Sequence, residues 1–317
     1  MQINPMKMAM SIVTIIGLLI ISSAWFFGSQ LKTPGYIHHT PEQGLHPRDK
    51  PPFALPQWNG LLADPKQSIG HDFETVEFPA VDGSTLRGWL IRSKNDKGKT
   101  QAVVAVHGGE SDRRSWLRHS PFLLNAGYSV LLFDMREHGI SDGASRGIAF
   151  GWRANYDVSS AVAFMKKQHS FDRVAVMGTS MGAVSAIIAA AKDKTIDAVI
   201  AENPFASAVD VLADADFFDQ LPRWYLVLVA HFNRQHFSVL KEPNAIDVVT
   251  DITPRPLLLM HGTEDQSVSP WQSQALFDAA KQPKSLWMLE GAGHTTLYNH
   301  DPQQFENKVL NFLKQHL

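Results

Sequence analysis

From Phe73 to the C-terminus, short apolar runs alternate with longer segments of helical spacing, and this alternation constrains the fold more than any other feature of the chain. Short apolar runs bounded by turn residues are typical of buried strands. Buried strands separated by helices form a mostly parallel sheet with helices on both faces. The sequence therefore predicts an α/β domain over residues 69–317. We expect strands at Phe73–Phe78, Thr85–Ile91, Ala102–Val106, Val130–Phe133, Val174–Met177, Ala198–Ala201, Leu257–Met260 and Ser285–Leu289. We expect helices at Trp116–Asn125, Asn155–Lys167, Met181–Ala191, Trp271–Ala280 and Gln303–Leu313.

Composition excludes several classes of protein. The 317-residue chain has 29 Lys and Arg against 31 Asp and Glu, a net charge of −2. A nucleic-acid-binding surface needs an excess of basic residues, so no nucleic-acid partner is expected. The chain has no cysteine, which excludes thiolate metal sites, cysteine nucleophiles and disulfides. Hydrophobic residues make up 44% of the chain, a fraction typical of a folded protein.

The N-terminal segment is long and apolar enough to cross a membrane. From Met8 to Leu31 there are 24 residues without a charge. A helix rising ~1.5 Å per residue can cross a ~30 Å hydrocarbon core over that length. We therefore expect a transmembrane anchor within residues 1–32, and a signal peptide cleaved at Ser22-Ser23-Ala24 is the alternative. A buried core helix is not expected, because nothing around the segment offers it a packing partner. Lys7 and Lys32 on its two sides specify the orientation weakly, with a slight preference for the folded domain outside the cytoplasm.

Two further stretches lie outside the alternating pattern. Prolines recur through residues 33–68 and predict an extended tether that holds the domain off a membrane, although Phe53 and Trp58 could instead dock the stretch on the domain as a belt. Residues 204–253 are too many for a simple crossover between strands and predict a helical cap. Within them, Trp224–Val229 is apolar on every side, which fits either a lid over a site or ordinary core.

The sequence Gly178-Thr179-Ser180-Met181-Gly182 lies where an expected strand passes into an expected helix. Glycine at both ends lets the backbone turn sharply and lets the helix approach the strand closely. Ser180 is thereby projected from the end of the strand at the start of a helix. This context predicts a nucleophilic serine, because the helix N-terminus also offers free backbone N–H groups to a developing oxyanion.

A serine hydroxyl needs a base to take its proton, and the base needs an acid to orient it. Asp265 follows the strand that ends near Met260, and His294 follows the strand that ends at Leu289. Because the carboxyl ends of parallel strands meet at one edge of a sheet, Ser180, Asp265 and His294 are expected to converge there. Glu264 is the competing candidate for the acid.

The strand Ala102–Val106 leads into His107-Gly108-Gly109-Glu110, where the missing side chains let a backbone N–H point at a substrate oxygen. We expect the N–H groups of Gly109 and Met181 to form an oxyanion hole, with Glu110 as the alternative to Gly109. His107 is expected to pack the turn. Arg113-Arg114 could contact an anionic group on the substrate, but solvation at the start of a helix is the expected arrangement. A supporting ion pair between Arg136 and Asp157 is a further hypothesis.

These residues together resemble the α/β-hydrolase superfamily over about Phe73–Leu317. The segment Phe133–Gly143 is similar to the family's Asp-x-Arg-Gly-His-Gly-x-Ser loop, with Glu137 where that pattern commonly has glycine. The resemblance implies an eight-stranded, mostly parallel sheet with helices on both faces and a short helical cap after strand six. The local sequences are most similar to a membrane-associated branch with depalmitoylase-like and bacterial esterase- or peptidase-like members. His107-Gly108-Gly109 lacks the third glycine of the lipase-type motif, which argues against the hormone-sensitive-lipase-like branch.

The expected reaction is hydrolysis through an acyl-enzyme on Ser180, with His294 as the base and Asp265 as its partner. The expected substrates are small-molecule or lipid-like carboxylic esters or thioesters, an activity of class EC 3.1 that needs no metal or organic cofactor. Three alternatives stay open: a serine peptidase or aminopeptidase with the same triad, a transferase with a non-water acceptor, and a non-catalytic membrane-tethered binding module on the same fold. The sequence does not specify the oligomeric state.

Overall fold

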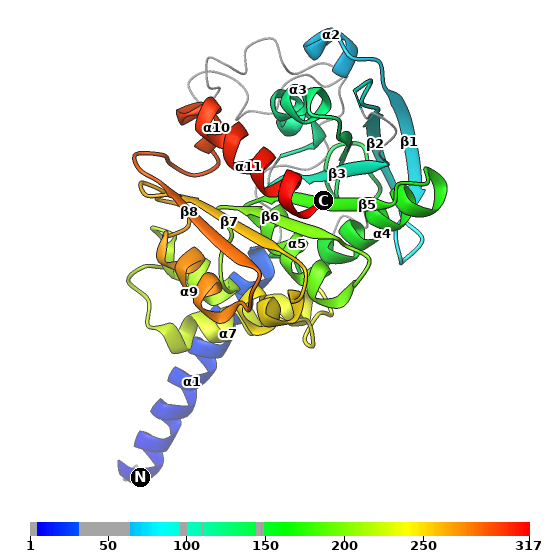
Figure 1. The fold of residues 1–317 in the computed structure, drawn as a ribbon. Coiled ribbons are helices and arrows are strands. Elements are labelled where there is room, and N and C mark those ends of the chain that lie inside the picture. Colours follow the sequence, from blue (N-terminus) through cyan, green and yellow to red (C-terminus); the bar gives the residue numbers. More distant parts are fainter. Residues whose placement is uncertain (1–4, 32–63, 96–99, 110, 144–146, 148) are drawn as a thin grey trace.

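A computed structural model describes residues 5–31, 64–95, 100–109, 111–143, 147 and 149–317. One twisted sheet crosses the domain with helices on both of its faces, and the N-terminal helix α1 projects away from it (Figure 1). The strands are β1 Glu74–Pro79, β2 Thr85–Ile91, β3 Gln101–Val106, β4 Ser129–Phe133, β5 Arg173–Thr179, β6 Ala198–Glu202, β7 Leu257–Gly262 and β8 Lys284–Leu289. The helices are α1 Pro5–Gln30, α2 Pro65–Ile69, α3 Ser120–Asn125, α4 Ala154–Gln168, α5 Met181–Lys192, α6 Ala208–Asp214, α7 Arg223–His236, α8 Ala245–Val248, α9 Trp271–Ala279, α10 Leu297–His300 and α11 Pro302–His316, with 3₁₀ turns η4 Arg113–His119 and η5 Val249–Ile252.

The strand order is β1-β2-β4-β3-β5-β6-β7-β8. β2 pairs antiparallel with both β1 and β4, and every other neighbouring pair is parallel. The eight-stranded, mostly parallel sheet predicted from the sequence is therefore confirmed. Because β5, β6, β7 and β8 are parallel, the loops that follow them leave the sheet at the same edge.

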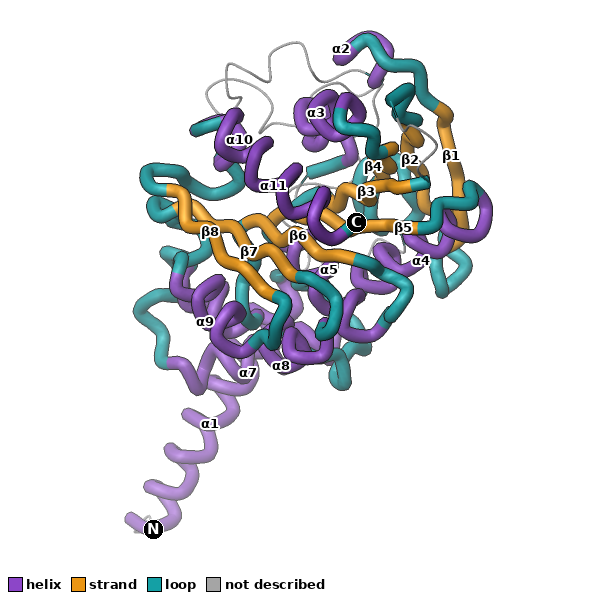
Figure 2. Tube along the Cα trace, in the orientation of Figure 1, coloured by secondary structure: helices purple, strands orange, loops and turns teal. Residues whose placement is uncertain are grey.

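The sheet separates two hydrophobic cores, one on each face. Alternate residues of β3 divide between them, with Val104 in the larger core and Val103 in the smaller. α4, α5 and α9 cover one face, and α3, α10 and α11 cover the other (Figure 2). β3 is buried on both faces, which explains why it reads as a continuous apolar run rather than as an alternating one.

The structure corrects two expected elements. The helix expected at Trp116–Asn125 begins as the 3₁₀ turn η4 and becomes α-helical only at Ser120, because Pro121 has no N–H to donate to a preceding turn. The stretch expected to be extended over residues 33–68 ends in the short helix α2, which Asp64 caps by accepting a hydrogen bond from the Gln67 N–H. Residues 33–63 of that stretch lie outside the described residues.

The segment between β6 and β7 contains α6, α7 and α8. α7 has a buried side that includes Tyr225, Leu226 and Val229, while Trp224 and Val227 are exposed. The apolar run Trp224–Val229 is therefore partly core and partly surface.

α7 packs along the C-terminal half of α1, where Ala24 is fully buried. The expectation that α1 lacks a packing partner is therefore wrong. The contact joins segments about 200 residues apart and combines small, polar and apolar side chains, which no local sequence pattern reveals.

Candidate active site

Ser180 lies between the end of β5 and the first residue of α5. Its backbone has φ 51° and ψ −121°, a strained conformation for a residue with a side chain. A Cβ at Gly178 would lie 2.4 Å from the Gly182 carbonyl oxygen, and one at Gly182 would lie 2.3 Å from the His107 carbonyl oxygen. Only glycine fits at either position, so the two glycines allow the sharp turn that presents Ser180.

The structure brings the three predicted residues together. His294 Nε2 lies 3.0 Å from Ser180 Oγ, and His294 Nδ1 lies 2.7 Å from Asp265 Oδ2. The Asp265 side chain is fully buried, while the His294 side chain is 23% exposed. Glu264, the competing acid, is exposed to solvent. The arrangement has the geometry that activates a serine hydroxyl, with a base in hydrogen-bond reach and a carboxylate behind it.

Asp265 is held by several donors besides His294. Its Oδ1 accepts hydrogen bonds from the backbone N–H groups of Ser267 and Val268, each at 2.9 Å. His261 Nε2 lies 3.1 Å from Oδ2. Burial alone would raise the pKa of Asp265, but hydrogen bonds from His261 and His294 outweigh it and hold that pKa below its usual value. The Asp265 carboxylate is therefore ionised at any pH at which His294 can act as the base.

Asn203 is a residue of the site that the sequence analysis missed. Its side-chain Nδ2 donates to Asp265 Oδ2 at 2.7 Å, and the residue is fully buried with φ 50°. The available signal was its position, because it directly follows β6 at the edge where β5 and β7 also end. Its neighbour Glu202 was missed as well: the Glu202 backbone oxygen accepts from the Ser180 N–H at 2.8 Å, and burial raises the pKa of the Glu202 carboxyl.

The loop after β3 lies against the serine, since a Cβ at Gly108 would be 3.5 Å from Ser180 Cβ. His107 fixes this loop: its Nε2 accepts from the Met135 N–H at 3.0 Å, so Nδ1 carries the proton that it shares with the Gly108 oxygen at 2.7 Å. In a trans peptide the carbonyl and the following N–H point in opposite directions, so this bond sets the direction of the Gly109 N–H. Glu110 lies outside the described residues.

The second expected oxyanion donor, Met181, is the first residue of α5, where a backbone N–H has no partner within the helix. Burial lowers the pKa of His107 to about 4, which keeps the imidazole neutral and able to accept from Met135. Among the described residues, no three His, Asp or Glu side chains are grouped to hold a metal ion.

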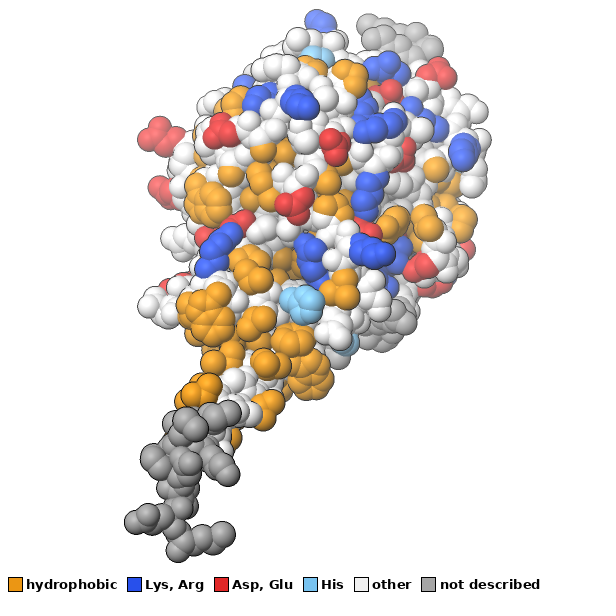
Figure 3. Space-filling view, turned by 90° about the horizontal axis from the view of Figure 1, so that it is seen from below, with side chains coloured by type: hydrophobic (Ala, Val, Ile, Leu, Met, Phe, Trp, Pro, Cys, Tyr) orange, Lys and Arg blue, Asp and Glu red, His pale blue; other side chains and the backbone are white. Residues whose placement is uncertain are grey.

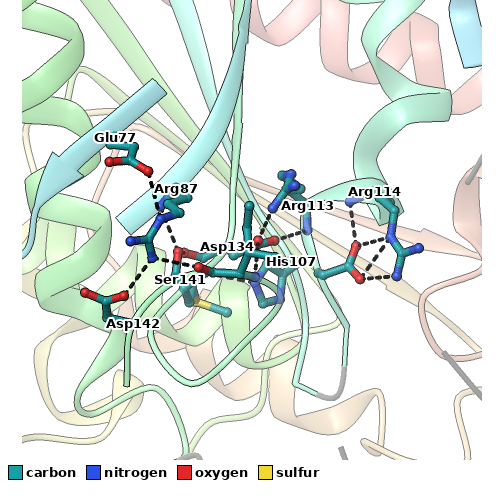
Figure 4. A network of polar contacts seen from close by, with 11 residues as sticks. Glu77, Arg87, His107, Arg113, Arg114, Asp134, Ser141 and Asp142 are labelled. Carbon is teal, nitrogen blue, oxygen red and sulfur yellow. Dashed lines mark hydrogen bonds and ion pairs between the residues drawn. The ribbon is translucent and has the colours of Figure 1, made fainter. Parts of the chain in front are cut away.

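A buried network supports the loops beside the site (Figure 4). The Arg113 backbone N–H donates to Asp134 at 2.8 Å, its guanidinium forms an ion pair with the same carboxylate, and it lies 4.2 Å from the centre of the Trp89 ring. Arg114 donates to Asp112 at 2.9 Å. Both arginines are 4% exposed, so the expectation that they are solvated is wrong. The sequence places both arginines shortly after the loop that follows β3, but it does not indicate that buried carboxylates pair with them.

The loop after β4 is fixed by a second set of contacts. Arg136 Nη2 lies 2.6 Å from Asp157 Oδ1, which confirms the hypothesis of an ion pair between these residues. Glu137 has φ 64°, a conformation that glycine adopts without strain, which accounts for the glycine usual at this position of the loop. Arg87 connects the loop to the edge of the sheet through ion pairs with Glu77 at 2.9 Å and Asp142 at 2.7 Å.

Comparisons with known proteins identify the family and similar folds. The family described as the prolyl oligopeptidase family matches residues 115–317. An esterase from Pyrococcus furiosus superimposes with a TM-score of 0.65 and 26% identity, over 79% of this chain and 94% of that one. The uncharacterised protein YqkD of Bacillus subtilis is 26% identical over 77% of this chain and 83% of its own length. The polyketide transferase ATR5 of Stachybotrys chlorohalonatus is 28% identical over 77% of this chain and 97% of its own.

Proposed function

The chain belongs to the prolyl oligopeptidase family within the α/β-hydrolase superfamily and is therefore a hydrolase, and we propose that it cleaves carboxylic esters or thioesters through an acyl-enzyme on Ser180. The observation that carries the proposal is the continuous chain of contacts from Ser180 through His294 to Asp265. Likeness to the Pyrococcus furiosus esterase supports the substrate class. The substrates are small-molecule or lipid-like acyl compounds.

In the first half of the reaction, Ser180 Oγ attacks the acyl carbonyl carbon while its proton passes to His294 Nε2. Asp265 stabilises the imidazolium that forms, and the N–H groups of Gly109 and Met181 donate to the oxyanion. The intermediate collapses as the bond to the leaving alcohol or thiol breaks, and His294 protonates that leaving group. In the second half, water gives a proton to His294 and attacks the acyl-enzyme, and Ser180 recovers its proton as the acid leaves.

The test is reaction with a fluorophosphonate probe together with turnover of p-nitrophenyl esters of increasing acyl-chain length. Wild-type protein should be labelled on Ser180 and should hydrolyse at least one of these esters. The Ser180→Ala variant should lose both labelling and turnover while it keeps the unfolding temperature of the wild type. A folded wild-type protein that the probe never labels would be a non-catalytic binding module.

A serine peptidase is the second candidate, because the matched family is described by an oligopeptidase activity. The same triad would serve, with His294 protonating an amine instead of an alcohol or thiol. Aminoacyl anilides and thioesters, tested beside the esters, separate the two: a higher kcat/KM on anilides than on esters and thioesters would assign a peptidase. Polyketide transferases among the relatives call for one further arm, in which added alcohols or amines are examined for acyl-transfer products.

We also propose that α1 is a single-pass anchor with the catalytic domain outside the cytoplasm. The described helix includes one stretch, Ser11–Gln30, that is long and apolar enough to cross a membrane. Protease treatment of sealed membrane vesicles of known orientation tests the side: a protease added to the outer face should digest the domain. Protection of the domain there, with digestion only after lysis, would place it in the cytoplasm.

A further inference from the structure

Helix α1 has two parts with different surroundings. Its first part projects from the domain with apolar side chains that are about half exposed or more: Ile12, Val13, Ile15, Ile16, Leu18, Leu19 and Ile21. Its second part turns one face toward the domain, and the residues covered there recur at Ile20, Ala24, Phe27 and Leu31, the three-to-four-residue spacing of a single helix face. The boundary between the two parts lies near Ile21.

Specific contacts hold the second part of α1 against α7. Tyr225 donates from its hydroxyl to Ser23 Oγ at 2.9 Å, and Asn233 donates from Nδ2 to the Gly28 carbonyl oxygen at 3.0 Å. A Cβ at Gly28 would lie 2.7 Å from the Val229 carbonyl oxygen, so only glycine allows this approach. Such contacts are unexpected for a signal peptide that leaves the protein, because its removal would leave the fully buried Asn233 without this acceptor.

The same contacts show that α1 and α7 run in the same direction, since Ser23 meets Tyr225 and Gly28 meets Val229. The N-terminal end of α7 therefore lies nearest to the point where α1 leaves the domain. Along the outer face of α7, Trp224 and Val227 are 56% and 50% exposed, and the exposed residue that follows toward the C-terminal end is His231. Arg223, the first residue of α7, is exposed as well and forms an ion pair with Asp210 at 2.7 Å. The large exposed apolar side chains of α7 lie only at its end nearest the projecting part of α1.

Further aromatic side chains surround the same point. Phe217, in the loop before α7, is 67% exposed and its ring centre lies 5.5 Å from that of Phe27 on α1. Trp25 and Phe26 of α1 are also more than half exposed. Figure 3 shows hydrophobic side chains gathered around the base of the projecting helix, with most Lys and Arg side chains farther away. Aromatic side chains at such a level are typical of a membrane–water interface.

We propose that the domain rests directly on a lipid bilayer through this surface, defined by Phe217, Trp224 and Val227 with Trp25 and Phe26, and that α1 stays attached and locked to α7. Only Met8–Ile21 then remains as uncharged helix for the hydrocarbon core, a helical length of about 21 Å at ~1.5 Å per residue, with Lys7 beyond its outer end. That is less than a ~30 Å core, so the bilayer surface must approach the base of the domain. The occupant is lipid because this surface lies beside the exposed apolar side chains of the projecting helix.

The inference rests on the proposed anchor and is independent of the chemistry at Ser180. Its test uses the absence of cysteine from the chain, which allows single-cysteine labelling of the full-length protein. Trp224→Cys carries an environment-sensitive fluorophore in the surface. His231→Cys lies seven residues farther along α7 and is the matched control, and Gln315→Cys on α11 reports the opposite face of the sheet. Each variant is reconstituted in phosphatidylcholine–phosphatidylglycerol vesicles with and without nitroxide-labelled lipid.

The expected result is quenching of the label at residue 224 that is several-fold stronger than at residues 231 and 315, and an intact α1 in the mass of membrane-purified protein. Equal quenching at all three positions, with the protein still floating with the vesicles, would overturn the docked arrangement and leave the anchor proposal standing. Failure to float, or a mass that lacks α1, would overturn both. Proximity of labels at residue 224 on two molecules, without lipid quenching, would assign the surface to a second copy of the chain and also reject the proposal.

Discussion

The catalytic edge and the α1–α7 junction both join segments that are far apart in the sequence, but different forces bring them together. At the catalytic edge, parallel strands deliver the loops that carry Ser180, Asp265 and His294 to one place, so backbone geometry does most of the positioning. At the junction, two helices meet through the close approach of one glycine, two side-chain hydrogen bonds and the apolar face that includes Ala24 and Phe27. The first arrangement is repeated by any sequence that forms the sheet, whereas the second depends on a few particular side chains.

The largest expected effect is a loss of ester hydrolysis, without a loss of stability, when Ser180 at the catalytic edge is replaced. Ser180→Ala should lower kcat/KM for esters by about 10⁴-fold or more, because the attacking oxygen is removed. Its unfolding temperature should match that of the wild type, since alanine keeps the Cβ and therefore the same strained backbone conformation. Ester turnover and thermal denaturation measure the two quantities. A variant with near-normal turnover would reject Ser180 as the nucleophile.

The second effect is the pH dependence of stability, which should differ between the two regions. His107 is neutral in the folded protein with a pKa of about 4, against 6.5 for an ordinary histidine. At this residue the unfolded chain therefore binds more protons as the pH falls, so the contribution of His107 to stability is complete above about pH 6.5 and is lost toward pH 4, by about 3 kcal/mol. Burial also lowers the pKa values of His119 and His138, which add to the loss. Denaturant unfolding at a series of pH values measures this loss.

His107→Gln is the comparison for that measurement. It removes the titrating group, so the loss of stability between pH 6.5 and pH 4 should be smaller than in the wild type, even if the variant is less stable at neutral pH. Identical slopes for the two proteins would show that His107 does not titrate in this range. The α1–α7 contacts use Tyr225, Ser23 and Asn233, so binding of α1 to the domain should not change over the same pH range.

The third effect tests the junction through two glycines of one helix. Gly28→Leu should destabilise the protein by about 1–3 kcal/mol, because a side chain there meets the backbone of α7. Gly17→Leu is the matched control: a Cβ at Gly17 has nothing within 4 Å, so the domain should unfold at the wild-type temperature. Thermal unfolding in detergent or vesicles reports both. Equal stability of the two variants would mean that α1 is not held against α7.

The smallest effect concerns the positioning of Asp265. Asn203→Gly keeps the φ of 50° without strain and removes the donor that lies 2.7 Å from Oδ2. We expect kcat to fall about tenfold with little change in KM, since one hydrogen bond to a charged group is lost and substrate binding is not touched. The pH profile of kcat should shift as well, whereas a purely structural role would leave its shape unchanged. An unaltered kcat and profile would remove Asn203 from the site.

The sequence predicts the sheet well because its strands are short apolar runs between turn residues, a local pattern. Ser180, Asp265 and His294 could be located for the same reason, since each lies within a few residues of the end of a strand. Asn203 was missed although it occupies an equivalent place after β6, because an amide there has no chemical role until its partner is known. The burial of Arg113 and the contact of α7 with α1 depend on distant segments. The residues next to Arg113 in the sequence do not indicate its carboxylate partner, and those within α7 do not indicate that it packs on α1.

The pair of Arg113 and Asp134 restricts how this sequence can diverge. Both side chains are almost fully buried, and a Cβ at Gly139 would lie 2.1 Å from the Asp134 carboxylate. Removing one member of a buried pair leaves an uncompensated charge, at a cost of about 3–5 kcal/mol, whereas joint replacement by apolar residues is often neutral. Descendants of this chain are therefore expected to exchange the two positions together, while Gly139 is expected to stay glycine even where the carboxylate is lost, because its φ of 49° strains any residue with a side chain.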